Sequence, residues 1–192
     1  MIYRMNRESG KADIIDLDVR QLTNRLKPFA PEKLDLMEYI LRAPSTNNRL
    51  SDIWPEQSLE CNFFANSKNT YKDINPYSRF LVLTENAYQT LRKILEQSGE
   101  CLKLNVEGVP MVLFNPLVFG NEDPELTVME YEQGVMVGVK KLIFKKEVEN
   151  LPIFKSKYTA NMCMYCNEEF RNIVKENGFE GICFQEDLDN IF

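Results

Sequence analysis

The order of apolar and polar positions predicts one short unit twice along the chain. The unit is an apolar strand, a polar helix cap, an amphipathic helix, a glycine and a second strand, and its copies cover residues 80–104 and 162–184. A shift of 82 positions places Thr84 on Cys166, which predicts that these two residues hold the same N-cap position. The same shift pairs two more apolar helix positions: Tyr88 with Phe170, and Leu91 with Ile173.

Outside this unit, the pattern predicts mainly strands. Alternating positions or short apolar runs predict strands over 2–5, 14–19, 59–64, 110–114, 126–131 and 135–144. Gly138 is expected to mark a bend in the last of them. Because helices are few and strands many, the predicted fold class is α+β: a mainly antiparallel or mixed sheet with a few helices, containing the repeated strand-helix-strand unit.

One more helix is predicted in the N-terminal third of the chain. Pro31 followed by Glu32 is favourable at a helix start, and the apolar residues after it recur at intervals of three and four. Pro44 lacks the N–H that a continuing helix needs, which predicts that this helix ends at Ala43.

The composition is typical of a folded protein. The 192 residues are 44% hydrophobic and 27% charged, so we expect a single compact domain, or two packed halves over 1–75 and 76–192. Acidic side chains outnumber basic ones by 29 to 23. This balance argues against a nucleic-acid partner, which requires a concentrated basic face, and is compatible with a basic protein partner as well as with solubility alone.

Histidine is absent from the sequence. Its absence removes Ser-His-Asp and Cys-His nucleophile systems and histidine-ligated zinc, so we expect no catalytic residue, no metal and no cofactor. The first residues are polar and charged where a secretory signal would be apolar, and no run of about 18 apolar residues occurs. We therefore expect a cytoplasmic protein that does not bind a membrane.

Five cysteines provide the one enzymatic alternative. Cys163 and Cys166 immediately precede a predicted helix, where a helix N-terminus stabilises a thiolate, so a thiol redox protein would use this pair. Against this, the two residues between them are bulky, and structural thiols explain the pair as well. A zinc site would need Cys61, Cys101 and Cys183 to be brought together by the fold, since no second paired spacing occurs.

Two acidic segments are the candidate partner-binding residues. The first contains Glu122, Asp123 and Glu125, and the second contains Glu186, Asp187 and Asp189. Neither has the ligand spacing of a calcium loop, so each is either a solvated turn or a surface that faces a basic partner.

Six fragments follow one another along residues 50–186: Leu50–Pro55, Phe80–Glu85, Val112–Pro116, Asn150–Lys155, Tyr165–Phe170 and Gly178–Phe184. In this order they resemble the bacterial immunity protein 11 family, once known as a domain of unknown function. This resemblance implies a cytosolic antidote that binds and neutralises the cognate toxin of a polymorphic toxin system. No binding residue is carried over from the family.

The leading expectation from the sequence is therefore a non-enzymatic bacterial immunity protein. It would neutralise a protein toxin by stoichiometric protein-protein interaction. The alternatives are a thiol redox protein that uses Cys163 and Cys166, or a non-catalytic adaptor.

Overall fold

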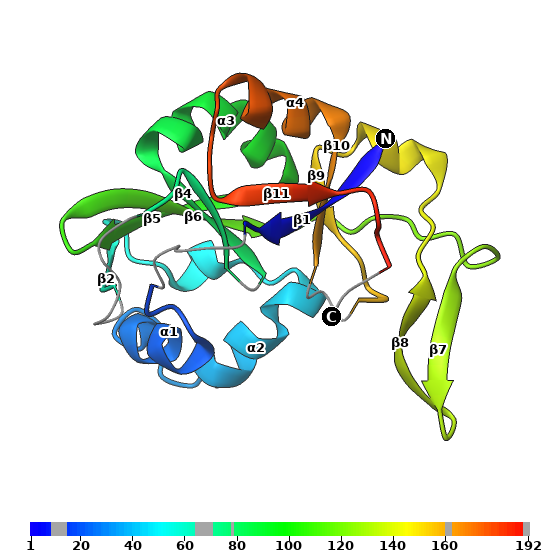
Figure 1. Ribbon diagram of the computed structural model, residues 1–192. Coiled ribbons are helices and arrows are strands. Elements are labelled where there is room, and N and C mark those ends of the chain that lie inside the picture. Colours follow the sequence, from blue (N-terminus) through cyan, green and yellow to red (C-terminus); the bar gives the residue numbers. More distant parts are fainter. Residues whose placement is uncertain (9–14, 64–70, 78, 160–162, 190–192) are drawn as a thin grey trace.

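The computed structural model describes residues 1–8, 15–63, 71–77, 79–159 and 163–189 (Figure 1). Its helices are α1 (Val19–Leu26), α2 (Leu36–Thr46), α3 (Glu85–Ser98) and α4 (Glu168–Glu176), with short 3-10 helices η1 (Leu50–Ile53) and η2 (Lys146–Asn150). Its strands are β1 (Ile2–Arg7), β2 (Leu59–Cys61), β3 (Ile74–Tyr77), β4 (Phe80–Thr84), β5 (Gly99–Val106), β6 (Val109–Pro116), β7 (Val128–Glu132), β8 (Val135–Lys141), β9 (Ile153–Lys155), β10 (Met164–Asn167) and β11 (Ile182–Gln185). The predicted α+β class is confirmed.

Three sheets account for these strands. A five-stranded sheet has the order β2-β5-β6-β4-β3, in which β2 runs parallel to β5 and the other neighbours are antiparallel. A four-stranded antiparallel sheet has the order β11-β1-β10-β9. The third sheet is the two-stranded hairpin β7-β8, which projects away from the rest of the molecule in Figure 1.

The two large sheets are joined beside residue 181. The Glu8 amide donates to the Gly181 carbonyl at 3.1 Å, and the Ile74 amide at the start of β3 donates to the Glu180 carbonyl at 3.0 Å. Gly181 has a φ of +100°, and a Cβ there would lie 2.4 Å from the Ile74 carbonyl oxygen. Only glycine permits both this backbone conformation and this close approach.

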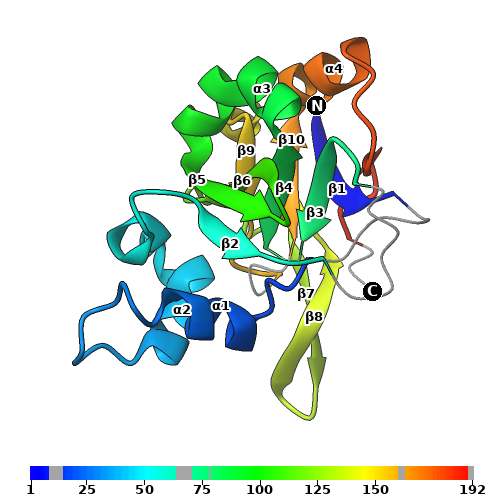
Figure 2. The ribbon, with the colours of Figure 1, turned by 90° about the vertical axis from the view of Figure 1, so that its left-hand side faces the viewer.

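Helices cover two sides of the molecule (Figures 1 and 2). One apolar core lies between the five-stranded sheet and helices α1 and α2. A second core is shared by α3, α4 and strands of both large sheets. A third, smaller core contains Val139, Leu142, Val148, Phe154, Cys163 and Tyr165 and lies at the base of the hairpin. The first core contains residues from both sides of position 75.

Both predicted strand-helix-strand stretches contain a strand, a helix and a strand. In each, the two strands flank a third, antiparallel strand: β4 and β5 flank β6, and β10 and β11 flank β1. Whether the two stretches are a true repeat stays a prediction.

The cap predicted for the second helix is wrong by one residue. The Ala87 amide donates to the Thr84 side chain, as expected, but the corresponding donor in α4, the Phe170 amide, donates to Asn167 at 3.0 Å. The helices therefore begin at Glu85 and Glu168, 83 positions apart. Cys166 is instead fully buried in the second core.

The predicted strand over 14–19 is also wrong. Ile14 lies outside the described residues, Ile15 forms a single bridge with Phe63, and Val19 is the first residue of α1. The acidic residues in this stretch, which alternate with apolar ones as in a strand, have other structural roles. Asp18 accepts a hydrogen bond from the Gln21 amide at 2.9 Å and so caps α1.

Both predicted ends of the next helix are wrong. α2 begins after Asp35, which accepts a hydrogen bond from the Glu38 amide at 3.0 Å, and it continues through Pro44 to Thr46. Pro44 lies in the last turn, where the Ser45 and Thr46 hydroxyls donate to the Arg42 carbonyl at 2.9 and 3.0 Å. These side-chain bonds satisfy the Arg42 carbonyl at the helix end. Pro44 removes one amide donor from the last turn, and the helix continues for two residues beyond it.

The strands predicted over 2–5 and 110–114 are confirmed within β1 and β6. Those predicted over 126–131 and 135–144 form the hairpin, though β8 ends earlier, at Lys141. None of the described helices is long and apolar enough to cross a membrane.

Candidate protein-binding surface

The two acidic segments are far apart in the sequence, but each contacts one of the two residues that follow β8. The Leu142 amide donates to the Asp189 carboxylate at 2.5 Å. The next residue, Ile143, accepts a hydrogen bond at its carbonyl from the Asp123 amide at 2.8 Å. The structure thus places both predicted partner-binding segments at the base of the β7-β8 hairpin.

Several of these carboxylates are engaged within the chain. Glu122 accepts hydrogen bonds from the Ser156 hydroxyl at 2.6 Å and from the Lys157 amide at 2.8 Å. Asp123 accepts from the Glu125 and Leu126 amides at 3.0 and 3.2 Å, which closes the acidic turn. Glu122 and Asp123 therefore hold the loop in shape.

The other predicted carboxylates face outward more fully. The side chains of Glu125, Glu186 and Asp187 are exposed. Asp187 also accepts a hydrogen bond from the Asp189 amide at 3.0 Å. Four lysines at the end of β8 or just after it are exposed as well, Lys140, Lys141, Lys145 and Lys146, so this part of the surface carries charges of both signs.

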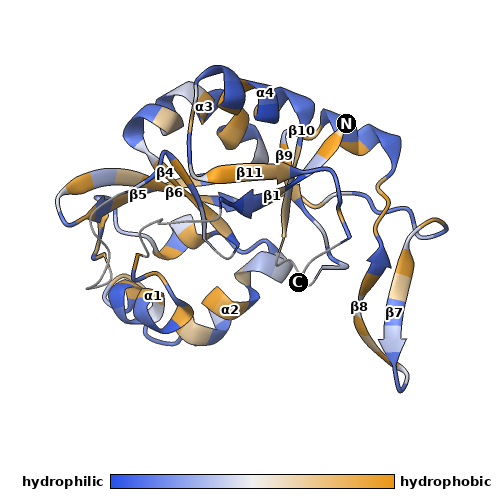
Figure 3. Ribbon diagram, in the orientation of Figure 1, coloured by the Kyte–Doolittle hydropathy of each residue, from blue (hydrophilic) through white to orange (hydrophobic). Residues whose placement is uncertain are grey.

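Exposed apolar side chains gather on the hairpin. More than half of the large apolar side chains that are exposed in the described part of the chain belong to it or to the turn before it: Leu126, Val128, Tyr131, Val135, Met136 and Val137. Figure 3 shows apolar colouring at the start of β7 and over the first part of β8. Gln133 and Gly134, both with positive φ, form the tight two-residue turn between the strands.

Four apolar residues of the hairpin share one face. Met129 pairs with Val139, and Tyr131 pairs with Met136; residues paired across strands point to the same side of a sheet. Met129 and Tyr131 are two positions apart on β7, so both pairs lie on one face. We call these four residues the hairpin stripe. It begins in the third core, where Val139 is buried and Met129 packs, and it ends in solvent at Tyr131 and Met136.

The cysteine pair of the redox alternative lies in two different apolar cores. Cys163 belongs to the core at the hairpin base, and Cys166 to the core beneath α3 and α4. Burial raises the pKa of both thiols. A reactive thiol is instead partly exposed and has a lowered pKa, so this environment is that of structural cysteines.

The remaining cysteines have similar surroundings. Burial raises the pKa of Cys61 and of Cys101 to about 12, and it also raises the pKa of Cys183. In the part of the chain that the structure describes, no group of three or more Cys, Asp or Glu residues is placed to hold a metal ion.

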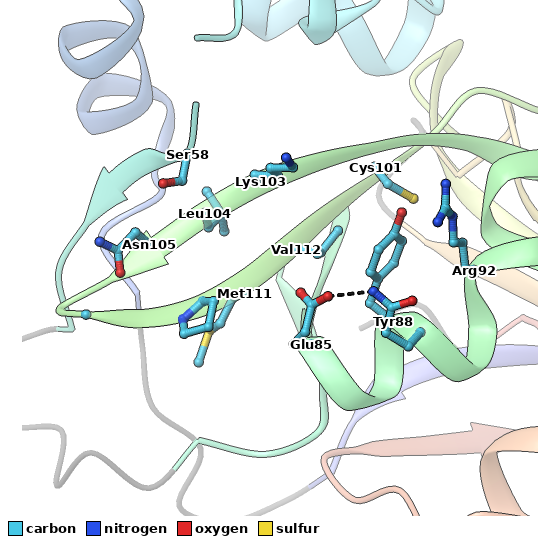
Figure 4. A pocket seen from close by; sticks show the side chains of 13 residues that line it. Ser58, Glu85, Tyr88, Arg92, Cys101, Lys103, Leu104, Asn105, Met111 and Val112 are labelled. Atoms are coloured by element: carbon cyan, nitrogen blue, oxygen red, sulfur yellow. Dashed lines mark hydrogen bonds between the residues drawn. The ribbon is translucent and has the colours of Figure 1, made fainter. Parts of the chain in front are cut away.

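A groove of about 750 Å³ lies between α3 and the β5-β6 hairpin (Figure 4). Its apolar floor includes Leu104, Met111 and Val112. Its polar groups are largely paired with each other or with neighbours: Gln89 donates to Glu85 at 2.6 Å, Arg92 pairs with Glu96 at 2.7 Å, and Asn105 donates to Glu60 at 2.9 Å. This internal pairing leaves little in the groove that would select a ligand.

A lysine is buried beside the third core. Lys155 on β9 is only 1% exposed, and its ammonium has no hydrogen-bond partner among the described residues. It lies 4.8 Å from the centre of the Phe119 ring. Burial, with a smaller effect of Arg79, lowers its pKa to about 8.

Sequence reasoning missed the hairpin stripe. The pattern predicts strands over 126–131 and 135–144, but it does not show that these two strands pair only with each other. The available signal was the Gln133-Gly134 turn, which joins two strands over two residues. An isolated two-stranded hairpin leaves one face or both faces uncovered.

In comparisons with known proteins, no protein-family model matches the chain, and no curated protein is significantly similar to it. The resemblance to the immunity protein 11 family therefore rests on the sequence fragments alone and stays a prediction.

Proposed function

We propose that this chain is a cytosolic bacterial immunity protein that neutralises a cognate toxin by stoichiometric binding. The observation that supports this proposal best is the projecting hairpin, which concentrates exposed apolar side chains above a base flanked by two acidic segments. The ordered family-like fragments point to the same function.

The chemistry of this surface suits a protein partner. Large apolar patches on a monomer usually mark interaction sites, and tyrosine and methionine are enriched at the centres of interfaces. Glu130 and Glu132 are the charged residues of the outer part of the hairpin, and they favour a basic partner and raise the rate of encounter. The toxin is therefore expected to present a basic surface around an apolar contact.

Neutralisation on this proposal needs no chemistry from the immunity protein. A bound hairpin blocks access to the toxin's own site, or holds the toxin in an inactive state, for as long as the complex lasts. The proposal accordingly assigns no catalytic residue and no cofactor to this chain.

Co-expression tests the proposal. The product of the adjacent gene is produced in a bacterial host with and without this chain, and growth is recorded. Purified components are then mixed, and the mass of the complex is measured by light scattering after size-exclusion chromatography. The proposal expects toxicity that this chain relieves and a complex of fixed stoichiometry.

Two results would count against the proposal. A harmless neighbour that forms no complex removes the immunity function. A harmless neighbour that does form a stable complex favours the adaptor alternative.

A further inference from the structure

The hairpin offers a partner two kinds of contact, its free strand edges and its faces, and the edges are poorly suited to pairing. On β7, Glu130 and Glu132 are exposed and would both lie beside an added strand. On β8, the register with β7 shifts twice, so Lys140 and Val137 are extra residues that bulge the strand. Charges and bulges are the devices that blunt edge strands against pairing.

The hairpin stripe, in contrast, is well suited to contact a partner through its side chains. Its buried end, Val139 and Met129, is fixed in the third core, which anchors the hairpin to the body. Its outer end is open, with Tyr131 61% and Met136 43% exposed. Tyrosine provides a large contact area with only two side-chain torsions to immobilise, and methionine adapts to the shape of a pocket.

The charges near the outer end have one sign. Among residues 130–138, the charged side chains are Glu130 and Glu132, and no basic residue occurs. By strand alternation both glutamates point to the face opposite Tyr131, so they leave the stripe uninterrupted and make the other face of the hairpin acidic near its outer end. Lys140 and Lys141 lie further back, at the end of β8.

Resting on the proposed function, we propose that the toxin receives Tyr131 and Met136 in an apolar pocket and that the toxin surface near this pocket is basic. The two side chains are the anchors of the complex, and Glu130 and Glu132, on the opposite face of the hairpin, steer the encounter without entering the pocket. The contact is made by the face of the hairpin and not by addition of a strand to its edge.

The test uses the full-length chain and the purified product of the adjacent gene, with affinity measured by titration calorimetry. The variant Tyr131→Ser/Met136→Ser is expected to weaken binding by at least about tenfold, because central aromatic anchors dominate interface energies. Both side chains are exposed, so the variant should keep its fold, which circular dichroism checks.

Two control variants accompany it. Phe29→Ser/Met37→Ser removes an aromatic residue and a methionine of similar exposure, 49% and 45%, from the α1-α2 region. Val135→Ser changes an exposed apolar residue on the opposite face of the same hairpin. Both controls are expected to bind within about twofold of the unchanged protein, since single surface changes outside a contact have small effects.

Glu130→Gln/Glu132→Gln tests the steering by a basic surface of the toxin. This variant should bind more slowly at low salt, and the difference should shrink as salt is added, because screening removes steering.

The outcomes separate the two proposals. A complex that survives Tyr131→Ser/Met136→Ser unchanged overturns the face contact while the immunity function stands. The absence of any complex with the unchanged protein overturns both. If the unchanged protein is a dimer that this variant dissociates, the stripe binds a second copy of the chain, and the pocket proposal is wrong.

Discussion

The buried Lys155 leads to the prediction that its replacement by methionine stabilises the protein near neutral pH. The side chain is enclosed, its ammonium has no hydrogen-bond partner among the described residues, and burial lowers its pKa from 10.5 to about 8. Methionine has a similar length and no charge to desolvate.

The magnitude follows from the difference between the pKa values of the folded and unfolded states. A gap of about 2.5 units corresponds to about 3 kcal/mol of lost stability wherever the lysine is charged in both states. Loss of the contact with the Phe119 ring offsets about 1–2 kcal/mol of the gain. Lys155→Met is thus expected to raise the free energy of unfolding by about 1–2 kcal/mol at pH 7.

The sign of the pH dependence is fixed by which state binds the proton. Between the folded pKa of about 8 and the unfolded value of 10.5, the unfolded chain keeps the Lys155 proton and the folded protein has released it. The loss of stability caused by burying Lys155 therefore decreases as pH rises through this window. The advantage of Lys155→Met should shrink by about 2 kcal/mol between pH 7 and about pH 9.5.

Urea unfolding at these two pH values, with reductant present, measures both quantities. Buried thiols also titrate in this range, but their effect is common to both proteins and cancels in the difference. Lys157→Met is the matched control, because this exposed lysine contacts the same Phe119 ring at 5.0 Å. A variant less stable than the original at pH 7, or an advantage that does not change with pH, would refute the reasoning.

Three further predictions concern the interior. Asn167→Ala removes the cap of α4 and should lower the free energy of unfolding by about 1 kcal/mol. Cys166→Ser should lower it by about 1–3 kcal/mol, because the variant buries a hydroxyl among apolar side chains. If Cys166→Ser leaves urea unfolding unchanged, the assignment of the cap to Asn167 is contradicted. Glu100→Ala leaves three donors without their acceptor, two backbone amides of η1 and a side-chain amide, so it should lower the free energy of unfolding by about 3 kcal/mol; an unchanged urea midpoint would refute this. A thiol reagent at about pH 8 should label Cys183 before Cys61, because Cys61 is buried and burial raises its pKa to about 12. Mass spectrometry of early time points measures the order of labelling, and the reverse order would show that this prediction is wrong.

The sequence pattern predicts the elements correctly where apolar residues are also buried in the fold. The prediction is wrong where a polar side chain forms a hydrogen bond that caps a helix. β6 is an apolar run that is buried in the sheet, and the pattern found it. The cap roles of Asp18 and Asn167 were missed because, in the sequence, a carboxylate or an amide that caps a helix looks like any other polar residue. Pro44 was misread because a proline near the end of a helix removes only one amide donor, and α2 continues for two residues beyond it.

The candidate site could be predicted only in part. The acidic segments are visible as charge runs, but their meeting around Leu142 and Ile143 depends on tertiary contacts. The hairpin stripe was hidden for a different reason: a strand alternating over an uncovered face has the same pattern as one over a core. What separates the two is whether a neighbouring element covers that face, and sequence pattern does not contain this information.

The place of β1 in the four-stranded sheet has a consequence for synthesis of the protein. Ile2 pairs with Asn167 and Arg7 pairs with Ile182, so both neighbours of β1 are translated long after it. At about 5–20 residues per second, roughly 10–30 s pass before β10 exists. During that time Tyr3 and Met5, which are buried in the folded protein, have no partner strands to cover them, and a holding chaperone would have reason to bind this segment. A chain released before β10 is made would carry this strand uncovered, so premature termination yields an aggregation-prone fragment and not a smaller folded protein.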